Sequence, residues 1–199
     1  MMNKVRFPLK GKLIFFVTRN INKFNEARRV LADEGIATAM IKLETLEIQS
    51  NSLEDIAKFR ALDAVKKSNL PVIVEDAGLF IEALKGFPGP YSSYVYRTIG
   101  RKGLLTLLKK TENRKAFFKS VVAYSEPGGD VQIFSGMVEG EIAHSERGRS
   151  GFGFDPIFKP LEGDGRTFGE MTTEEKNRIS HRSRALKKFA DWYRSVDKS

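Results

Sequence analysis

A glycine-rich loop carries the side chains of this chain that are best suited to hold a flat heterocycle. The loop at 150–156 reads Ser-Gly-Phe-Gly-Phe-Asp-Pro, with two aromatic rings and one carboxylate. Glycine lets the backbone approach a ligand closely, and an aromatic ring can stack on a base. Phe152 or Phe154 would be the stacking ring. The alternative is that both rings belong to the core, and it is strongest for Phe154.

A distant basic pair, His181-Arg182, is predicted to lie where the last helix begins. A cation is unfavourable at a helix N-terminus, because that end already carries partial positive charge. The pair therefore indicates an anion or an electron-rich carbonyl to bind. Arg182 offers a planar fork of donors for such a group, and nearby Lys176 could neutralise a phosphate. A lone histidine is more often structural, which is the alternative for His181.

The segment Thr18–Lys23 leaves a predicted buried strand and enters a predicted helix. Free backbone N–H groups at such a junction, together with Lys23, would face an anion. The segment lacks the glycines and the Lys-Ser/Thr ending of a Walker loop. Plain helix capping by Asn20 or Asn22 is the alternative.

The acidic pair Glu75-Asp76 follows a second apolar run, 72–74, and is predicted to end that strand. Adjacent side chains on an extended chain point to opposite faces, so one carboxylate can face a cleft while the other supports it. Carboxylates at the end of a strand could hold Mg²⁺, which shares its ligand shell with substrate phosphates. Glu47, near the end of the preceding strand, could add a ligand. The alternative is an ordinary acidic turn.

The elements that position these groups follow from hydrophobic periodicity and capping signals. In chain order we expect strand 13–17, helix 23–34, a strand within 38–47, helix 52–68, strand 72–74, a helix around 104–108, strands 117–124 and 131–138, and a last helix from about residue 180. The first five predict an α/β sheet with crossover helices, and the turn at 127–130 predicts an antiparallel hairpin. We expect one domain over residues 1–199, with two lobes on one mixed central sheet around a cleft.

Composition limits the classes of function. The 199 residues are 41% hydrophobic and 30% charged, which suits one folded domain, and no apolar run is long enough to span a bilayer. The absence of cysteine excludes disulfides, thiolate catalysis and Cys-ligated zinc, and is compatible with the cytoplasm. The net charge of +9 fits nucleic-acid binding, a phosphate-rich small substrate, or a plain solvated surface.

Five segments, taken in order, make the chain resemble the inosine triphosphate pyrophosphatase family, also called the Ham1-like pyrophosphatases of noncanonical purine nucleotides. The resemblance covers roughly residues 13–193. The matching segments are Thr18-x-Asn20-x-x-Lys23-x-x-Glu26, Val74–Leu79, Gly86–Ser92, Gly151–Phe158 and Glu170–Arg182. Each segment alone is a weak signal, and five at compatible spacing are a strong one.

The resemblance implies an elongated α/β fold, usually dimeric, with a central substrate cleft. It implies Mg²⁺-dependent hydrolysis of ITP, dITP and XTP to the monophosphate and pyrophosphate. Its triphosphate contacts fall on Thr18, Asn20 and Lys23, its metal ligands on Glu47 and Asp76, and its proton acceptor on Asp76. Phe152 would stack on the base, and the rest of the pocket would be formed by Gly153, Phe154, Asp155, Lys176, His181 and Arg182.

Two substrate-binding positions depart from the family pattern. Ala77 stands where relatives usually have Thr or Ser, so a hydroxyl contact is missing. Arg60 stands where many relatives have Lys, which replaces a point charge by a planar fork. Arg60, Lys23 and Lys176 would stabilise the departing pyrophosphate.

Two other functions stay open at this point. One is a nucleotide pyrophosphatase of the septum-inhibitor type, with other nucleotide preferences. The other is a basic nucleic-acid-binding domain, against which the interleaving of acidic and basic residues argues. The resemblance favours a purine nucleoside triphosphate as the partner and a cytoplasmic homodimer, with no membrane and no nucleic acid required.

Overall fold

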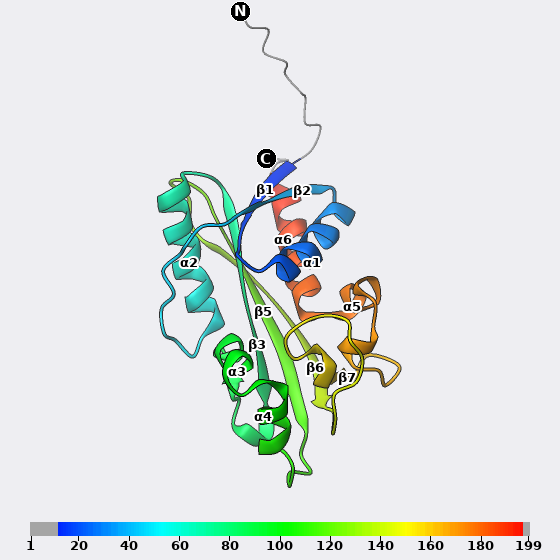
Figure 1. The fold of residues 1–199 in the computed structure, drawn as a ribbon. Helices are drawn as coiled ribbons and strands as arrows, with labels where there is room; N and C mark the ends of the chain where they lie inside the picture. The colour runs from blue at the N-terminus through cyan, green and yellow to red at the C-terminus, as the bar shows by residue number, and fades with distance from the viewer. Residues whose placement is uncertain (1–11, 197–199) are drawn as a thin grey trace, which may run out of the picture.

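A single mixed β-sheet runs through the part of the chain that the structure describes, residues 12–196 of a computed structural model. The predicted domain, 1–199, extends past both ends of this range. Three strands run most of the length of the molecule, and they are β3, β5 and β6 (Figure 1). The strands are β1 (Lys12–Val17), β2 (Ile36–Ile41), β3 (Val72–Ile81), β4 (Pro88–Gly89), β5 (Lys115–Ser125), β6 (Gln132–Ile142) and β7 (Phe158–Pro160).

The strand order is β2-β1-β3-β5-β6-β7, and β4 pairs with β3. β1 is parallel to β2 and β3, while the β3–β5, β5–β6 and β6–β7 pairs are antiparallel. The predicted crossovers and the predicted hairpin are therefore confirmed, and so is the mixed α/β class with an elongated central sheet.

Two of the differences from the predicted strand boundaries affect the site. β3 does not end at the acidic pair but continues to Ile81, because β5 pairs with it along its whole length. Glu75-Asp76 therefore lies inside a strand. β2 begins at Ile36 and ends at Ile41, so the residues from 42 to the start of the next helix form a loop and not a strand.

Several of the α-helices begin at a capping residue. Asn20, Ser52 and Thr172 cap their helices with side-chain oxygens, as the sequence suggests. Within residues 12–196, no helix is both long and apolar enough to cross a membrane. The α-helices are α1 (Ile21–Asp33), α2 (Leu53–Ser68), α3 (Ser92–Thr98), α4 (Gly100–Leu107), α5 (Thr173–Ile179) and α6 (His181–Val196).

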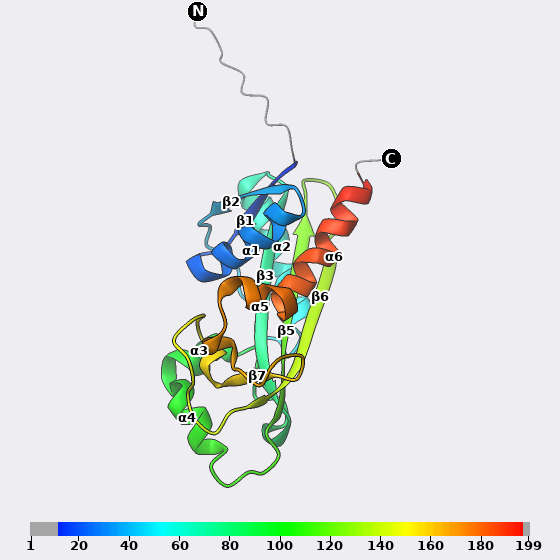
Figure 2. The ribbon, with the colours of Figure 1, turned by 90° about the vertical axis from the view of Figure 1, so that its right-hand side faces the viewer.

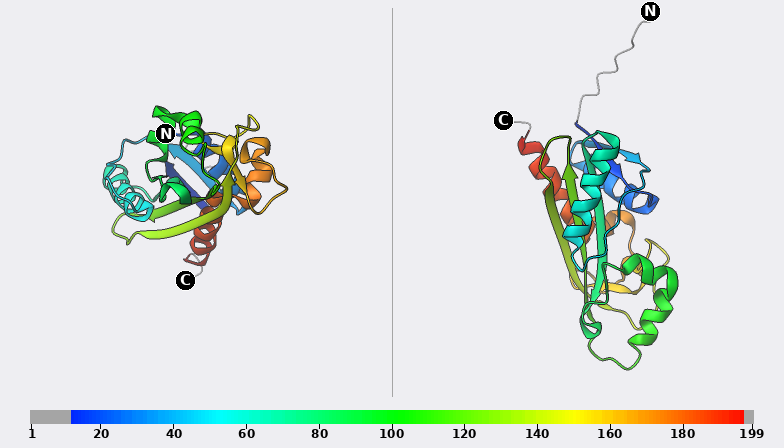
Figure 3. Two further views of the ribbon diagram at one scale, coloured as in Figure 1. Left: turned by 90° about the horizontal axis from the view of Figure 1, so that it is seen from below. Right: turned by 90° about the vertical axis from the view of Figure 1, so that its left-hand side faces the viewer.

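Different helices cover the two faces of the sheet at the end where β1 and β2 lie, which is the upper end in Figure 1. α1 and α6 pack on one face against residues such as Phe16 and Ile73 (Figure 2). α2 packs on the other face against Val72 and Val74 (Figure 3). Neighbouring residues of β3 thus serve opposite cores, as the alternation of a strand requires.

A third core lies at the other end of the long strands, where α3 and α4 are found (Figures 1 and 3). It contains Leu79, Phe118 and Leu104, together with buried rings from the segments around β7. On one face of β3, Ile73 belongs to the core under α1 and α6, and Leu79 belongs to this third core, which we call the lower core. The residues between them on that face are Glu75 and Ala77, so a polar position separates two apolar ones.

Gly136 lets α6 approach β6 closely. A Cβ at this position would lie 2.2 Å from the backbone oxygen of His181 and 2.5 Å from the nitrogen of Ala185. We expect Gly136→Ala to lower the free energy of unfolding by about 2 kcal/mol, because backbone atoms of a packed helix must move. Urea denaturation measures this. Gly163→Ala is the control, because its Cβ would meet nothing closer than 3.7 Å; an equal loss in both variants would contradict the argument.

Candidate active site

The candidate site lies where β3 has a free backbone edge. Among the described strands, β1 pairs with β3 only at Val72 and Ile73, and β4 pairs with it only at Leu79 and Phe80. Between these points a cleft of about 1050 Å³ opens beside β3. Its walls come from the β1–α1 junction, the loop after β2, α2, α3, the 150–156 loop and the start of α6.

Every predicted site residue lines this one cleft. The sequence therefore identifies side chains that the fold brings together from positions far apart in the chain. They are Thr18, Asn20, Lys23, Glu47, Arg60, Asp76, Ala77, Phe152, Gly153, Phe154, Asp155, Lys176, His181 and Arg182.

Glu75 and Asp76 point to opposite faces of β3, as predicted, and have different environments. Glu75 is fully buried as a side chain. Lys23 Nζ lies 2.8 Å from Glu75 Oε2, and Ser120 Oγ donates a hydrogen bond of 2.5 Å to Oε1. Arg182 Nε donates to the same oxygen at 3.1 Å. Burial alone would raise the pKa of Glu75, but Arg182 and Lys23 hold it well below the usual range, so the group stays ionised.

Asp76 is held by one oxygen only. Arg60 Nη1 donates to Asp76 Oδ1 at 2.5 Å, and Arg60 Nε donates to Thr45 Oγ1 at 3.2 Å. The buried Oδ2 atom of Asp76 has no hydrogen-bond partner among the described residues. Burial raises the pKa of Asp76, against the opposing effect of Arg60 and Lys23. A carboxylate with a raised pKa and a free oxygen is suited to accept a proton.

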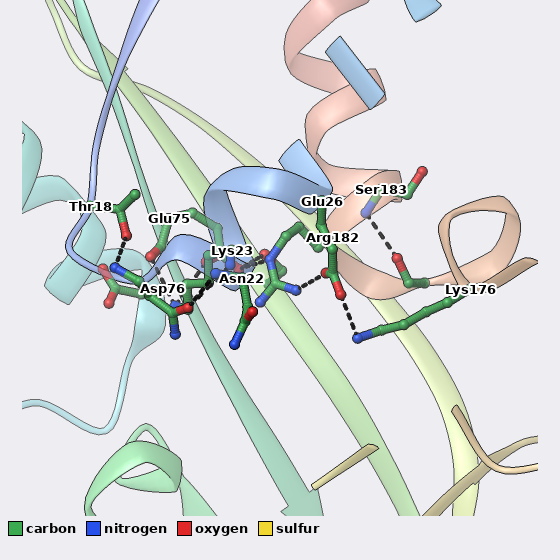
Figure 4. A network of polar contacts seen from close by, with 12 residues as sticks. Thr18, Asn22, Lys23, Glu26, Glu75, Asp76, Lys176, Arg182 and Ser183 are labelled. Carbon is green, nitrogen blue, oxygen red and sulfur yellow. Dashed lines mark hydrogen bonds and ion pairs between the residues drawn. The ribbon is translucent and has the colours of Figure 1, made fainter. Parts of the chain in front are cut away.

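Buried charges run from Glu75 on the acidic strand through Arg182 and Glu26 to Lys176 (Figure 4). Glu26 on α1 accepts hydrogen bonds from Lys176 Nζ at 2.8 Å and from Arg182. Lys176 also donates to Asp155 Oδ2 at 2.6 Å, and Arg182 continues to Glu75. Burial would raise the pKa of Glu26, but Arg182 and Lys176 lower it below its ordinary value.

The ring of Phe152 sits beside these cations. Its centroid is 4.9 Å from Lys176 Nζ and 5.3 Å from Arg182 Cζ, and its backbone N–H donates to Asp155 at 2.8 Å. Phe152 remains half-buried at the cleft wall, which suits a stacking ring. Phe154 is only 4% exposed and its ring belongs to the lower core, in an edge-on contact with Tyr96.

The start of α6 carries one charge and not two. His181 is buried and stacks on Phe118 with centroids 4.6 Å apart. Burial, followed by the nearby Arg182 and Lys176, lowers the pKa of His181 well below its ordinary value, so the ring is neutral at pH 7. The sequence predicts that this basic pair binds an anion. The anions that Arg182 binds are carboxylates of the protein itself, those of Glu26 and Glu75.

The β1–α1 junction adopts the capping alternative. The Asn20 side chain accepts from the backbone N–H of Asn22 at 3.0 Å and of Lys23 at 3.2 Å. Thr18 Oγ1 accepts from the backbone N–H of Asn20 at 3.1 Å. Both side chains still line the cleft, so a phosphate contact by them stays a prediction.

Sequence reasoning missed the partners of these groups. Glu26, Ser120 and Thr45 each anchor a cleft cation or carboxylate, and no role was predicted for them. Two had a signal. Ser120 is a polar residue among the apolar alternate residues Ala116, Phe118 and Val122 of β5, and Glu26 lies four residues before Val30 on the buried face of α1.

The donor set suits a hard divalent cation that brings its own ligands. Asp76 Oδ2 is an uncommitted carboxylate oxygen, and exposed Glu47 lines the same cleft. Within residues 12–196, no three His, Asp or Glu side chains are grouped to hold an ion by themselves. Mg²⁺ is usually held by one or two carboxylates with waters and substrate phosphates, so these residues fit Mg²⁺ better than a fully protein-ligated ion.

Known proteins resemble this chain over nearly its whole length. The model of the Ham1 family matches residues 14–192. A dITP/XTP pyrophosphatase of Methanopyrus kandleri is 53% identical over 92% of this chain and 96% of its own. One from Thermococcus kodakarensis is 54% identical over 89% and 95%. The solved Ham1 protein of Staphylococcus aureus superposes with a TM-score of 0.80 at 30% identity, covering 93% of this chain and all of its own.

The buried charge network predicts how Glu26 affects stability. We expect Glu26→Gln to lower the free energy of unfolding by about 3 kcal/mol at pH 7, because two buried cations lose a shared carboxylate. The pKa of Glu26 is lowered in the folded state, so its contribution is complete above its unfolded pKa and is lost as the pH falls through the folded value. The difference from the wild type should therefore shrink below about pH 4.

Urea denaturation at pH 7 and at low pH measures this difference. Glu141→Gln is the matched control, because it breaks a half-exposed ion pair with Lys159 that is worth at most about 1 kcal/mol. A loss no larger than in the control, or one that persists unchanged at low pH, would argue against the network.

Proposed function

The chain belongs to the Ham1 family, and from this we propose that it hydrolyses deaminated purine nucleoside triphosphates, namely dITP, ITP and XTP, to the monophosphate and pyrophosphate. The observation that supports this most is the shared cleft, which holds both the half-buried Phe152 ring and the free Oδ2 atom of Asp76. The relatives named dITP/XTP pyrophosphatase match nearly the full chain, which supports the same substrates here.

In the proposed reaction, Asp76 activates the attacking water. Oδ2 of Asp76 accepts a proton from the water while the water oxygen forms a bond to the α-phosphorus. The bond between the α-phosphorus and the bridging oxygen breaks, and pyrophosphate leaves. Arg60 supports this role by holding Oδ1, which fixes the carboxylate with Oδ2 free.

Asp76 and Glu47 would hold Mg²⁺ together with the phosphates of the substrate. When bound, the cation neutralises charge on the phosphate oxygens. Lys23 lies at the same end of the site, 2.8 Å from Glu75, and would contribute a positive charge toward the triphosphate.

The proposed base pocket distinguishes a 6-keto from a 6-amino purine. The base would stack on Phe152, and donors of Arg182 would face its edge. Nε and Nη1 of Arg182 bind Glu75 and Glu26, which leaves Nη2 for the base. A 6-keto oxygen accepts such a donor, whereas the 6-amino group of adenine would leave it unpaired in a buried site. A homodimer and a cytoplasmic location stay predictions.

A substrate panel tests this function. We expect pyrophosphate release from dITP and XTP to exceed release from dATP by at least roughly 100-fold in kcat/KM. Asp76→Asn should lower kcat on dITP by about 100-fold or more, with a smaller change in KM, because the proton acceptor is lost. Pyrophosphate and orthophosphate are measured separately. Asp130→Asn, in the β5–β6 turn, is the control. Orthophosphate as the product, or a preference for ordinary nucleotides, would contradict the proposal.

Removing Mg²⁺ and adding it back tests the proposed metal requirement. We expect EDTA to abolish pyrophosphate release and Mg²⁺ to restore it. Glu47→Gln should raise the half-saturating Mg²⁺ concentration by roughly tenfold or more, since even outer-shell partners of a metal are worth that much. Glu44→Gln is the matched control, because Glu44 lies in the same loop and lines the same cleft. If the Glu47 variant needed no more Mg²⁺ than the Glu44 variant, the metal role of Glu47 would be wrong.

A further inference from the structure

The walls of the cleft nearly cancel their own charge. Six cationic side chains and five carboxylates line it, and Glu26 adds a further carboxylate directly behind Lys176 and Arg182. A nucleoside triphosphate brings several negative charges into this space. Its attraction to the cleft therefore depends on cations whose charge is not already balanced by the protein.

Most of the cleft cations are committed to a carboxylate. Lys23 pairs with Glu75, and Arg60 pairs with Asp76. Lys176 and Arg182 each contact two carboxylates. Arg19, on the exposed rim, lies 3.7 Å from Glu44.

Arg97 on α3 is different. Its side chain is exposed and lines the cleft, and among the described residues it has no ion pair or hydrogen bond of its side chain. Arg101, in the first turn of α4, binds the carboxylate of Glu146 and the backbone oxygen of Gly153. Glu146 is therefore already paired with Arg101. Arg97 is left as the one cleft cation without a carboxylate partner in residues 12–196.

The packing of α3 turns Arg97 toward the site. Ser93, Tyr96 and Arg97 are spaced i, i+3 and i+4, so they share one face of the helix, and all three line the cleft. Val95, on another face, is buried in the lower core. The rings of Tyr96 and Phe154 meet edge-on with their centroids 5.6 Å apart, which fixes this face of α3 against the glycine-rich loop.

We propose that Arg97 binds the phosphates of the substrate and is a substrate-binding residue of this chain. The inference rests on the proposed function. A guanidinium can bind two phosphate oxygens at once, and an uncommitted one gives up no protein ion pair when it does so. Because Arg97 is exposed, its contribution should weaken with added salt more than that of the buried cations.

The test measures binding of inorganic tripolyphosphate by calorimetry, so that it does not depend on turnover. We expect Arg97→Gln to weaken tripolyphosphate binding by about tenfold, the lower end for a charge-assisted contact, and to leave binding of inosine unchanged. Arg97→Lys should recover part of the loss. Lys102 is an exposed residue of α4 outside the cleft, so Lys102→Gln removes the same charge and should bind tripolyphosphate as the wild type does.

Kinetics on dITP separate the two proposals. Arg97→Gln should raise KM by a similar factor, and high salt should reduce its difference from the wild type. Equal binding of tripolyphosphate by the Arg97→Gln and Lys102→Gln variants would overturn the role of Arg97 while the wild type still hydrolyses dITP. A wild type that binds tripolyphosphate through Arg97 but releases no pyrophosphate would instead overturn the proposed function.

Discussion

The carboxylate of Glu75 is buried in the middle of a β-strand, and its need for cations organises the centre of the molecule. An ionised group in such a place is costly unless it is paired and hydrogen-bonded. Lys23 comes from α1, Arg182 from α6 and Ser120 from β5, so one side chain ties three elements to β3. Glu26 is likewise buried and paired with two cations, Lys176 and Arg182. Through these cations the polar contacts extend from Glu75 to the glycine-rich loop.

This polar centre fits the sheet because the strands around β3 are of unequal length. β1 pairs with only two residues of β3, whereas β5 pairs with ten, so β3 continues beyond β1 and has a free edge. Glu75 on one face is stabilised by cations, and Asp76 on the other keeps an oxygen free at that edge. A carboxylate that ties elements together and one that keeps a free oxygen are thus adjacent in sequence and lie on opposite sides of the strand.

The sequence predicts the order of elements and the members of the site, because periodicity, caps and turns are local signals. It cannot give the length of β3, since only pairing with β5 extends that strand through Glu75 and Asp76. It likewise misses the partners of the charged groups, because Glu26 and Lys176 are 150 residues apart. For His181-Arg182 the local electrostatic argument is sound but incomplete. It predicts anions near the helix start, and the protein itself supplies them.

Pairing the site cations with protein carboxylates has a chemical consequence. A cleft that is close to neutral holds most of its charged side chains in place without a ligand, because most of these charges already have a partner. It also cannot attract a triphosphate strongly by itself, so binding depends on the few groups that remain free. Those groups are Arg97, the divalent cation that Asp76 and Glu47 would hold, and the open donors beside Phe152. Selectivity for the base then has a larger share in total affinity than it would in a strongly positive cleft, which would hold any nucleoside triphosphate by its phosphates alone.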